Sequence, residues 1–161
     1  MIEDASRNAV IGQVVLILSG LLGGFLGFLI SLFGLGAYAL GMSGFADVFG
    51  DSRIFRFVVF SIIFALAGGA VILGGFPRFG LLLLAIGSVF DVLANYYLYE
   101  ASGVPAIIWG YGLMLLGIPL LLIYIGILFI VIGRVMVIYG YHAIPEVYRI
   151  RKKARNHVGL G

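Results

Sequence analysis

The chain has 161 residues, of which 63% are hydrophobic and only 11% are charged, whereas soluble domains average about 45–50% apolar and about 25% charged residues. A soluble fold would lack the polar residues that its surface needs, so the composition favours a membrane protein. The net charge of +3 is concentrated in a basic segment near the C-terminus, and the absence of cysteine excludes disulfides and thiolate metal sites.

Four apolar stretches, residues 9–40, 54–76, 79–99 and 105–141, are long enough to cross the hydrocarbon core, which takes about 20 helical residues. Backbone groups in lipid must be hydrogen-bonded within their own segment, and these runs are continuous, which favours helices over a barrel of short alternating strands. We therefore predict an all-α, polytopic transmembrane bundle of about four spanning helices.

The first and last stretches are longer than a plain span requires. The first stretch, as one helix of about 32 residues, would measure about 48 Å. In the last stretch Pro119 predicts a kink, because proline removes a backbone hydrogen bond. An alternative is an interfacial segment from Pro105 to Gly117 followed by a helix that spans to Tyr141.

The basic segment divides the chain into a transmembrane bundle, residues 1–142, and a basic tail, residues 143–161. Because basic residues favour the cytoplasmic side, we predict a cell-membrane protein with a cytoplasmic C-terminus and, after four spans, a cytoplasmic N-terminus. Arg78 agrees with this topology, whereas Arg53 and Arg56 would lie on the outer side.

The start of the chain and its composition bear on processing and source. The start is acidic and its apolar run is too long for a secretory signal, so we expect the first helix to be retained. The scarcity of asparagine and glutamine and the lack of cysteine are a thermophile signal, for which an archaeal source is one interpretation.

Glycines recur at intervals of seven residues in every stretch. Seven residues are nearly two turns, so each series lies on one helix face, where small residues let membrane helices approach closely. Chance would produce some pairs among 25 glycines, but runs of three and four favour a packing seam, either within one chain or between subunits. The series comprise Gly20, Gly27, Gly34, Gly41, Gly68, Gly75, Gly80, Gly87, Gly103, Gly110, Gly117, Gly126, Gly133 and Gly140.

A polar stripe is predicted near the middle of the third stretch, where Ser88, Asp91 and Asn95 share one helix face. A charge at this depth is expensive, so the stripe could carry a proton or bind a cation, or it could be a buried hydrogen-bond cluster that fixes the bundle. Arg134 could pair with Asp91 if the third and fourth helices are neighbours, or its side chain could extend to the headgroups.

Five basic residues of the tail, Arg149, Arg151, Lys152, Lys153 and Arg155, predict attraction to anionic lipid headgroups, at about 1 kcal/mol per charge. Nothing beyond charge favours nucleic acid. An aromatic belt at the membrane interface accounts for the remaining aromatic residues near the stretch ends. These are Tyr96, Tyr97, Tyr99, Trp109, Tyr111, Tyr139 and Tyr141.

No motif for nucleotide binding, nucleophilic hydrolysis or zinc proteolysis occurs. His142 and His157 have no ligand partner at suitable spacing, so we expect no metal site. The lack of catalytic motifs predicts no cofactor and no enzymatic activity, and the sequence identifies no small-molecule substrate. The leading hypothesis is a structural subunit that packs with copies of itself or with partner membrane subunits in a membrane, filament or viral shell. The alternatives are a small proton or cation transporter that uses Asp91 and Asn95, and an accessory subunit of a larger membrane complex.

Overall fold

The computed structural model describes residues 1–120 and 125–158, and of Pro119, Arg155, His157 and Val158 it describes the backbone only. The described residues form six helices and no strand: α1 (Ile2–Leu22), α2 (Gly24–Phe49), α3 (Ser52–Leu73), α4 (Pro77–Ser102), α5 (Pro105–Leu120) and α6 (Ile125–Val158). Every helix except the shorter α5 is long and apolar enough to cross a membrane. The predicted all-α membrane helical bundle is confirmed.

The first apolar stretch forms two helices, so the prediction of one overlong first helix is wrong. The chain reverses at Gly23 and Gly24, which have φ angles of 61° and 55°. Glycine adopts such angles without the steric penalty that a Cβ atom brings. Hydropathy does not reveal this turn because the residues on both sides of it are equally apolar.

The last apolar stretch also forms two helices rather than one helix kinked at Pro119. Pro119 lies next to the last residue of α5, and α6 begins at Ile125. The two helices run antiparallel, because Gly110 lies against Gly133, and Gly117, seven residues further along α5, lies against Gly126, seven residues earlier on α6. The alternative of an interfacial segment followed by a span is replaced by this packed helix pair.

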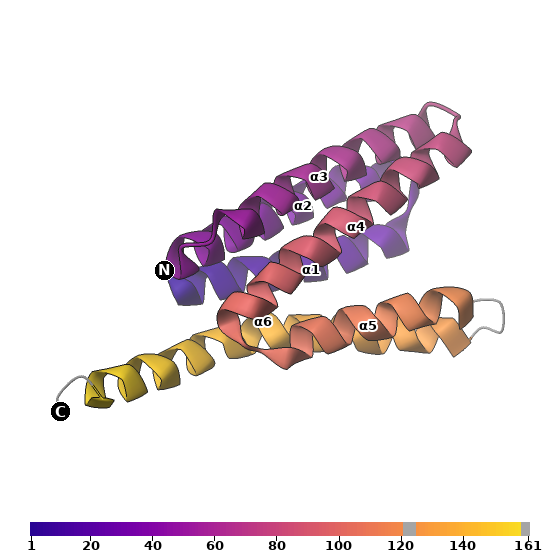
Figure 1. Ribbon diagram of the computed structural model, residues 1–161. Helices are drawn as coiled ribbons and strands as arrows, with labels where there is room; N and C mark the ends of the chain where they lie inside the picture. The colour runs from indigo at the N-terminus through magenta and orange to yellow at the C-terminus, as the bar shows by residue number, and fades with distance from the viewer. Residues whose placement is uncertain (121–124, 159–161) are drawn as a thin grey trace.

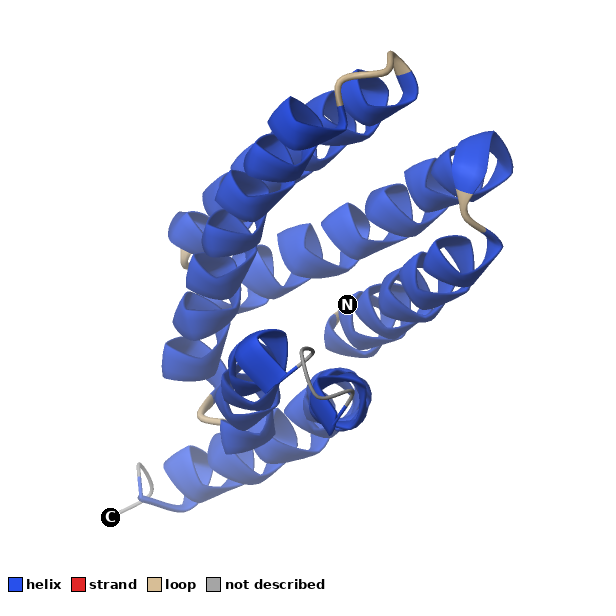
Figure 2. Ribbon diagram, turned by 90° about the vertical axis from the view of Figure 1, so that its right-hand side faces the viewer, coloured by secondary structure: helices blue, strands red, loops and turns tan. Residues whose placement is uncertain are grey.

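The six helices form three antiparallel hairpins, α1–α2, α3–α4 and α5–α6, and each helix packs most extensively against its hairpin partner (Figure 1). We call the end with the N-terminus and the links at residues 50–51 and 103–104 the base, and the opposite end the tips. The hairpins meet at the base, and the α5–α6 hairpin diverges from the other two toward the tips (Figure 1). Figure 2 views the molecule from the tips, where the ends of the three hairpins lie apart.

The hydrophobic core lies in the base half of the molecule. Its largest buried side chains include Met42 and Phe45 of α2, Leu98 of α4, and Tyr141 and Ile144 of α6. Large apolar side chains are exposed in both halves, including Leu40 and Trp109 in the base half. In the tip halves they include Phe25, Phe33, Phe76, Phe79, Leu116 and Leu128. The structure is therefore cohesive at the base, whereas a surrounding apolar phase must cover the flanks of its tips.

Local signals fix the two links at the base. Gly50 and Gly103 end α2 and α4 in the left-handed conformation, with φ angles of 67° and 68°. Asp51 begins α3 as its N-cap and accepts a hydrogen bond from the backbone N–H of Arg53 at 3.0 Å. Its pKa lies below the ordinary value, chiefly because the Arg53 side chain also hydrogen-bonds its carboxylate.

Helix α6 contains 34 residues, which corresponds to about 51 Å at 1.5 Å per residue, and it extends beyond the other helices at the base (Figure 1). It continues without a break across the predicted boundary at residues 142–143, so the basic tail is the end of α6. Arg149 of this segment forms an ion pair with Glu3 of α1. The ring of Tyr148 packs edge-on against Phe49 of α2.

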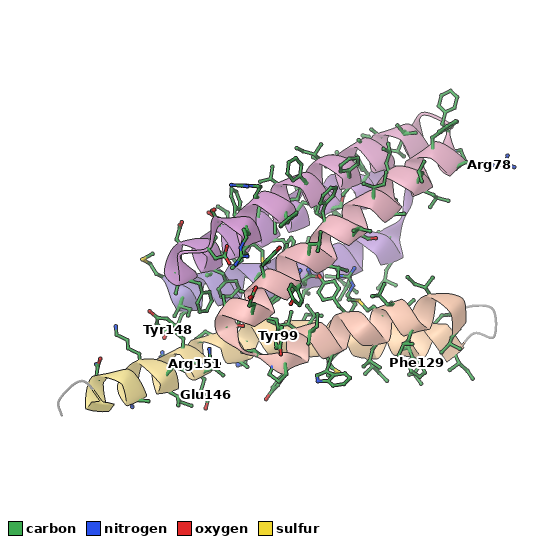
Figure 3. All side chains as sticks on the ribbon, viewed as in Figure 1. Arg78, Tyr99, Phe129, Glu146, Tyr148 and Arg151 are labelled. Atoms are coloured by element: carbon green, nitrogen blue, oxygen red, sulfur yellow. The ribbon has the colours of Figure 1, made fainter. Side chains whose placement is uncertain are left out.

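The distribution of charge between the two ends differs from the prediction. Arg53 approaches Glu100 at 3.9 Å, so it lies at the base with the basic tail and not at the opposite end. Figure 3 shows Arg78 at the tips, far from Glu146 and Arg151. The predicted placement of Arg78 beside the tail is therefore wrong, because the last stretch forms two helices, so that three helices rather than two separate Arg78 from the tail.

Candidate functional site: a polar cluster that joins the hairpins

The candidate site is centred on Asp91, in the middle of α4. One oxygen of its carboxylate accepts a hydrogen bond from the hydroxyl of Tyr38 at 2.7 Å, and the other accepts from the hydroxyl of Tyr111 at 2.5 Å. Tyr38 lies on α2 and Tyr111 on α5. A single carboxylate thus connects helices from all three hairpins, because α4 itself belongs to the second.

Asn95 lies one turn after Asp91 and is completely buried, with 0% of its surface exposed. Its amide nitrogen lies 2.8 Å from the hydroxyl oxygens of both Tyr38 and Tyr111. Its amide oxygen accepts a hydrogen bond from the hydroxyl of Tyr141 on α6 at 2.6 Å. Asn95 is therefore the centre of the cluster, with partners on three other helices.

The proton arrangement of this cluster is self-consistent. An amide nitrogen has two hydrogens, and a tyrosine hydroxyl can donate one hydrogen bond while it accepts another. Asn95 can thus donate one hydrogen to each of Tyr38 and Tyr111, while both hydroxyls donate to the side-chain oxygens of Asp91. Among the described residues, no buried side-chain nitrogen or oxygen lacks a hydrogen-bond partner, so we describe the cluster as closed.

The cluster also reaches the first helix. The hydroxyl of Ser6 on α1 donates to the backbone carbonyl oxygen of Tyr141 at 2.8 Å, and both residues are buried. Polar contacts are effective between membrane helices because the hydrophobic effect does not drive those helices together. The hydrogen bonds around Asn95 and Ser6 therefore hold the hairpins at the base.

Arg134 does not form the predicted ion pair with Asp91. Its Nη1 atom donates instead to the side-chain oxygen of Gln13 on α1 at 2.6 Å, and no Arg134–carboxylate ion pair occurs in the described part of the chain. The Asp91 carboxylate accepts instead from the hydroxyls of Tyr38 and Tyr111. Arg134 joins the third hairpin to the first, as a second polar contact.

Ser88 shares a helix face with Asp91 but does not belong to the closed cluster. Its hydroxyl donates to the carbonyl oxygen of Ala85, within α4. Ser88, Asp91, Tyr111 and Arg134 line one cavity of about 210 Å³ between α4, α5 and α6. The structure thus separates the predicted stripe into a buried part at Asn95 and a part beside this cavity.

Most of the heptad glycines lie at the contact within a hairpin. An added methyl group on Gly110 would lie 2.6 Å from the carbonyl oxygen of Gly133, and one on Gly68 would lie 2.8 Å from that of Gly80. The glycines in these close contacts are Gly27, Gly34, Gly41, Gly68, Gly80, Gly87, Gly110, Gly117, Gly126, Gly133 and Gly140. These seams lie between the two helices of each hairpin, within one chain.

Three of the predicted packing glycines have other positions. A methyl group on Gly20 would meet nothing within 4 Å, so this glycine faces outward. Gly75 lies in the α3–α4 turn with a φ angle of 89°, and Gly103 ends α4 with a φ angle of 68°. Heptad spacing alone does not distinguish a packing glycine from a turn glycine, and for these three residues the prediction is wrong.

For two tyrosines the predicted position in an interfacial belt is wrong. Tyr111 and Tyr141 are buried in the polar cluster, whereas Trp109 and Tyr139 are exposed, as expected of an interfacial belt. Tyr97 stacks on Phe57 with ring centroids 5.5 Å apart. Tyr96 and Tyr99 complete the aromatic group on α4 and lie within 6.5 Å of each other, measured between ring centroids.

The basic residues of the tail are spread around the end of α6. Arg149 pairs with Glu3, Arg151 approaches Gly103 at the end of α4, and Lys152 and Lys153 are exposed. The side chains of Arg155 and His157 lie outside the described part of the structure. Within that part, no group of three or more metal-ligating side chains occurs.

Sequence reasoning missed five polar contributors to the contacts between hairpins: Ser6, Gln13, Tyr38, Tyr111 and Tyr141. A signal was present for Tyr38, which lies four residues after Gly34 and three before Gly41 and so shares their packing face. The other four residues contact polar partners on helices that are distant in the sequence, so sequence spacing does not predict these contacts.

The fold and cluster define an all-helical protein with five helices able to span a membrane and a buried polar centre. Comparisons with known protein families, curated proteins and solved structures gave no match to this chain.

Proposed function

We propose that this protein is a non-enzymatic structural subunit of a membrane assembly, in which the diverging tip halves of the hairpins pack against neighbouring copies. The observation that carries the proposal is the exposure of large apolar side chains along the tips, where the hairpins separate (Figure 1). The closed polar cluster supports it, because every buried side-chain nitrogen and oxygen of the described residues has a hydrogen-bond partner.

Two outward-facing glycines support contacts between copies. Methyl groups added to Gly36 of α2 and Gly112 of α5 would meet nothing within 4 Å. Lipid tails are as apolar as these flanks, so association in a membrane depends on close van der Waals contact, which small residues permit. The seams inside the hairpins do not serve this purpose, since both of their faces are already occupied.

The proposed topology places the base at the cytoplasmic surface and the tips at the opposite surface of a cell membrane. Arg7, Arg53, Arg56 and the basic tail all lie in base segments, whereas Arg78 is the basic residue that the described tips carry. Basic residues favour the cytoplasmic side, so both termini would be cytoplasmic, and the exposed Lys152 and Lys153 would meet anionic headgroups.

The alternative of proton or cation transport finds less support. Asn95 is completely buried, and Asp91, although it borders the cavity between α4, α5 and α6, is held by two tyrosine hydroxyls, so no continuous polar path is evident among the described residues. An accessory role in a larger complex would use the same apolar flanks, and only the composition of the purified particle separates it from self-assembly.

The proposal is tested by the particle mass of the protein purified in a mild detergent, measured by light scattering with the detergent contribution subtracted. We expect a multiple of the 17.3 kDa chain mass. Gly36→Leu and Gly112→Leu, at positions where an added Cβ atom meets nothing within 4 Å, should lower that multiple if these flanks form the contact. A folded, monodisperse monomer for the unmodified protein would overturn the proposal.

A further inference from the structure

The cavity between α4, α5 and α6 combines two opposite charges with an apolar wall. Asp91 and Arg134 line it together with the hydroxyl-bearing Ser88, and its volume is about 210 Å³. Asp91 lies 14 residues after the start of α4 and Arg134 nine after the start of α6, which places them about 21 Å and about 14 Å from the tips. Both charges therefore lie well inside the apolar part of the molecule.

Arg134 has hydrogen-bonding capacity that its partner in the structure does not use. A guanidinium group has five N–H donors, and within the described residues the one hydrogen-bond partner of Arg134 is Gln13, at 2.6 Å. An intramembrane arginine is costly and typically marks a functional site when it borders a cavity. A ligand atom in this cavity could accept a hydrogen bond from one of the remaining N–H groups of Arg134.

Asp91 offers the complementary property. Each of its carboxylate oxygens accepts from one tyrosine, and a carboxylate has about four lone-pair sites in total. The carboxylate can therefore accept one more hydrogen bond on its cavity side. The formal charges of Asp91 and Arg134 cancel, which disfavours a ligand head with a net charge and favours a neutral head that both donates and accepts.

The remaining wall accommodates hydrocarbon. Met114, Leu115 and Ile118 of α5 and Ile130 of α6 continue from the charged pair toward the tips, where α4 diverges from the α5–α6 hairpin (Figure 1). A chain bound there would lie along apolar side chains and leave the protein between two hairpins.

We propose that this cavity binds a neutral lipid alcohol, whose hydroxyl donates to Asp91 and accepts from Arg134 while its hydrocarbon chain lies between α4 and the α5–α6 hairpin. The site is independent of the proposed assembly, since one chain supplies every group that lines it.

The test uses the whole protein in phosphatidylcholine vesicles with trace hexadecanol that carries a photoreactive diazirine. After irradiation, the labelled residues are mapped by mass spectrometry. We expect labelling of the cavity wall on α5 and α6, and about tenfold less of it in the presence of excess hexadecanol. Excess hexadecane should compete weakly, because one well-placed hydrogen bond to a charged group corresponds to about a tenfold difference in affinity. Excess palmitate or hexadecylamine should also compete weakly, because the formal charges of Asp91 and Arg134 cancel and disfavour a charged head.

Two tryptophan variants provide a matched pair. Leu115 lines the cavity and Leu116 does not, although both are exposed to a similar degree, 54% and 58%. Leu115→Trp should reduce labelling at least about fivefold, and Leu116→Trp should leave it unchanged. Arg134→Gln should weaken the preference for the alcohol over hexadecane, and the acceptor at Asp91 should retain part of it.

Equal competition by hexadecane and hexadecanol on the unmodified protein would mean that the cavity holds bulk acyl chains, and it would overturn the proposal. Equal labelling of the two tryptophan variants would also overturn it. The competition experiment needs no variant, so it remains decisive even where a substitution impairs folding.

Discussion

Replacing Asn95 by leucine removes the centre of the polar cluster while it keeps the number and branching of the heavy atoms in the side chain. Asn95 is completely buried and makes hydrogen bonds with Tyr38, Tyr111 and Tyr141. The first two hydroxyls keep Asp91 as an acceptor after the substitution. The hydroxyl of Tyr141 loses its acceptor and stays buried.

The expected loss of stability has two parts. Three hydrogen bonds between membrane helices disappear, at about 0.6 kcal/mol each, or about 2 kcal/mol together. The stranded hydroxyl of Tyr141 adds about 1–3 kcal/mol, the desolvation penalty of an unpaired buried polar group. We expect Asn95→Leu to lower the free energy of unfolding by about 4 kcal/mol.

A double variant distinguishes these two parts. Adding Tyr141→Phe to Asn95→Leu removes the stranded hydroxyl, so it should restore about 1–3 kcal/mol. Tyr141→Phe alone should be destabilising, because it leaves the buried amide oxygen of Asn95 without a donor. Tyr139→Phe, at an exposed position two residues earlier on α6, should have no effect.

The measurement is unfolding in mixed micelles by titration with a denaturing detergent, followed by circular dichroism. If Tyr141→Phe lowers stability by the same amount in the unmodified protein and in Asn95→Leu, the two side chains are not coupled. Such additivity would refute the hydrogen-bond arrangement assigned to the cluster.

Three further outcomes follow from contacts elsewhere in the structure. Gly110→Ala should destabilise the α5–α6 hairpin in a thermal melt because the methyl group would lie 2.6 Å from a backbone carbonyl, whereas Gly112→Ala, with open space around it, should be neutral or stabilise by up to about 1 kcal/mol. Asp51→Ala should cost about 1 kcal/mol through loss of the α3 N-cap, whereas Asp51→Asn should keep the cap. The pKa of Asp51 is lower in the folded protein than in the unfolded chain, so the extra stability of the unmodified protein over the Asp51→Asn variant should be present above the unfolded pKa. That extra stability should vanish as the pH falls through the folded pKa. Replacing Lys152 and Lys153 by glutamine should weaken enrichment of anionic lipid around the purified protein by about 1 kcal/mol per charge, measured by lipid mass spectrometry.

The helical class could be predicted from the sequence because long apolar runs without charge have few stable alternatives in a bilayer. The number of helices could not. Gly23 and Gly24 occur within a continuous apolar run, where glycines are compatible with a packing seam as well as with a turn. Only the packing of α1 against α2 distinguishes the two interpretations.

The packing faces were partly predictable for the same reason. Gly27, Gly34 and Gly41 recur at heptad spacing and face α1. Spacing identifies a face but not its partner, because the partner depends on where the chain reverses. The seams lie within hairpins because the chain reverses direction after each glycine-lined helix.

The candidate site was predictable at its centre and not at its edges. Asp91 and Asn95 stood out because polar residues are rare at that depth. Tyr111 and Tyr141 did not, because tyrosine near the end of an apolar stretch is typical of an interfacial belt. Their burial in the cluster depends on the antiparallel α5–α6 pairing.

The most direct measurement is the accessibility of single cysteines in sealed vesicles, because the chain contains no cysteine of its own. Ser52→Cys places a thiol at the base and Phe76→Cys places one at the tips; both parent residues are exposed. If the hairpins cross the membrane, a membrane-impermeant maleimide should label these two thiols from opposite sides. Labelling of both from the same side, or of Phe76→Cys from neither, would contradict three membrane-crossing hairpins joined at the base.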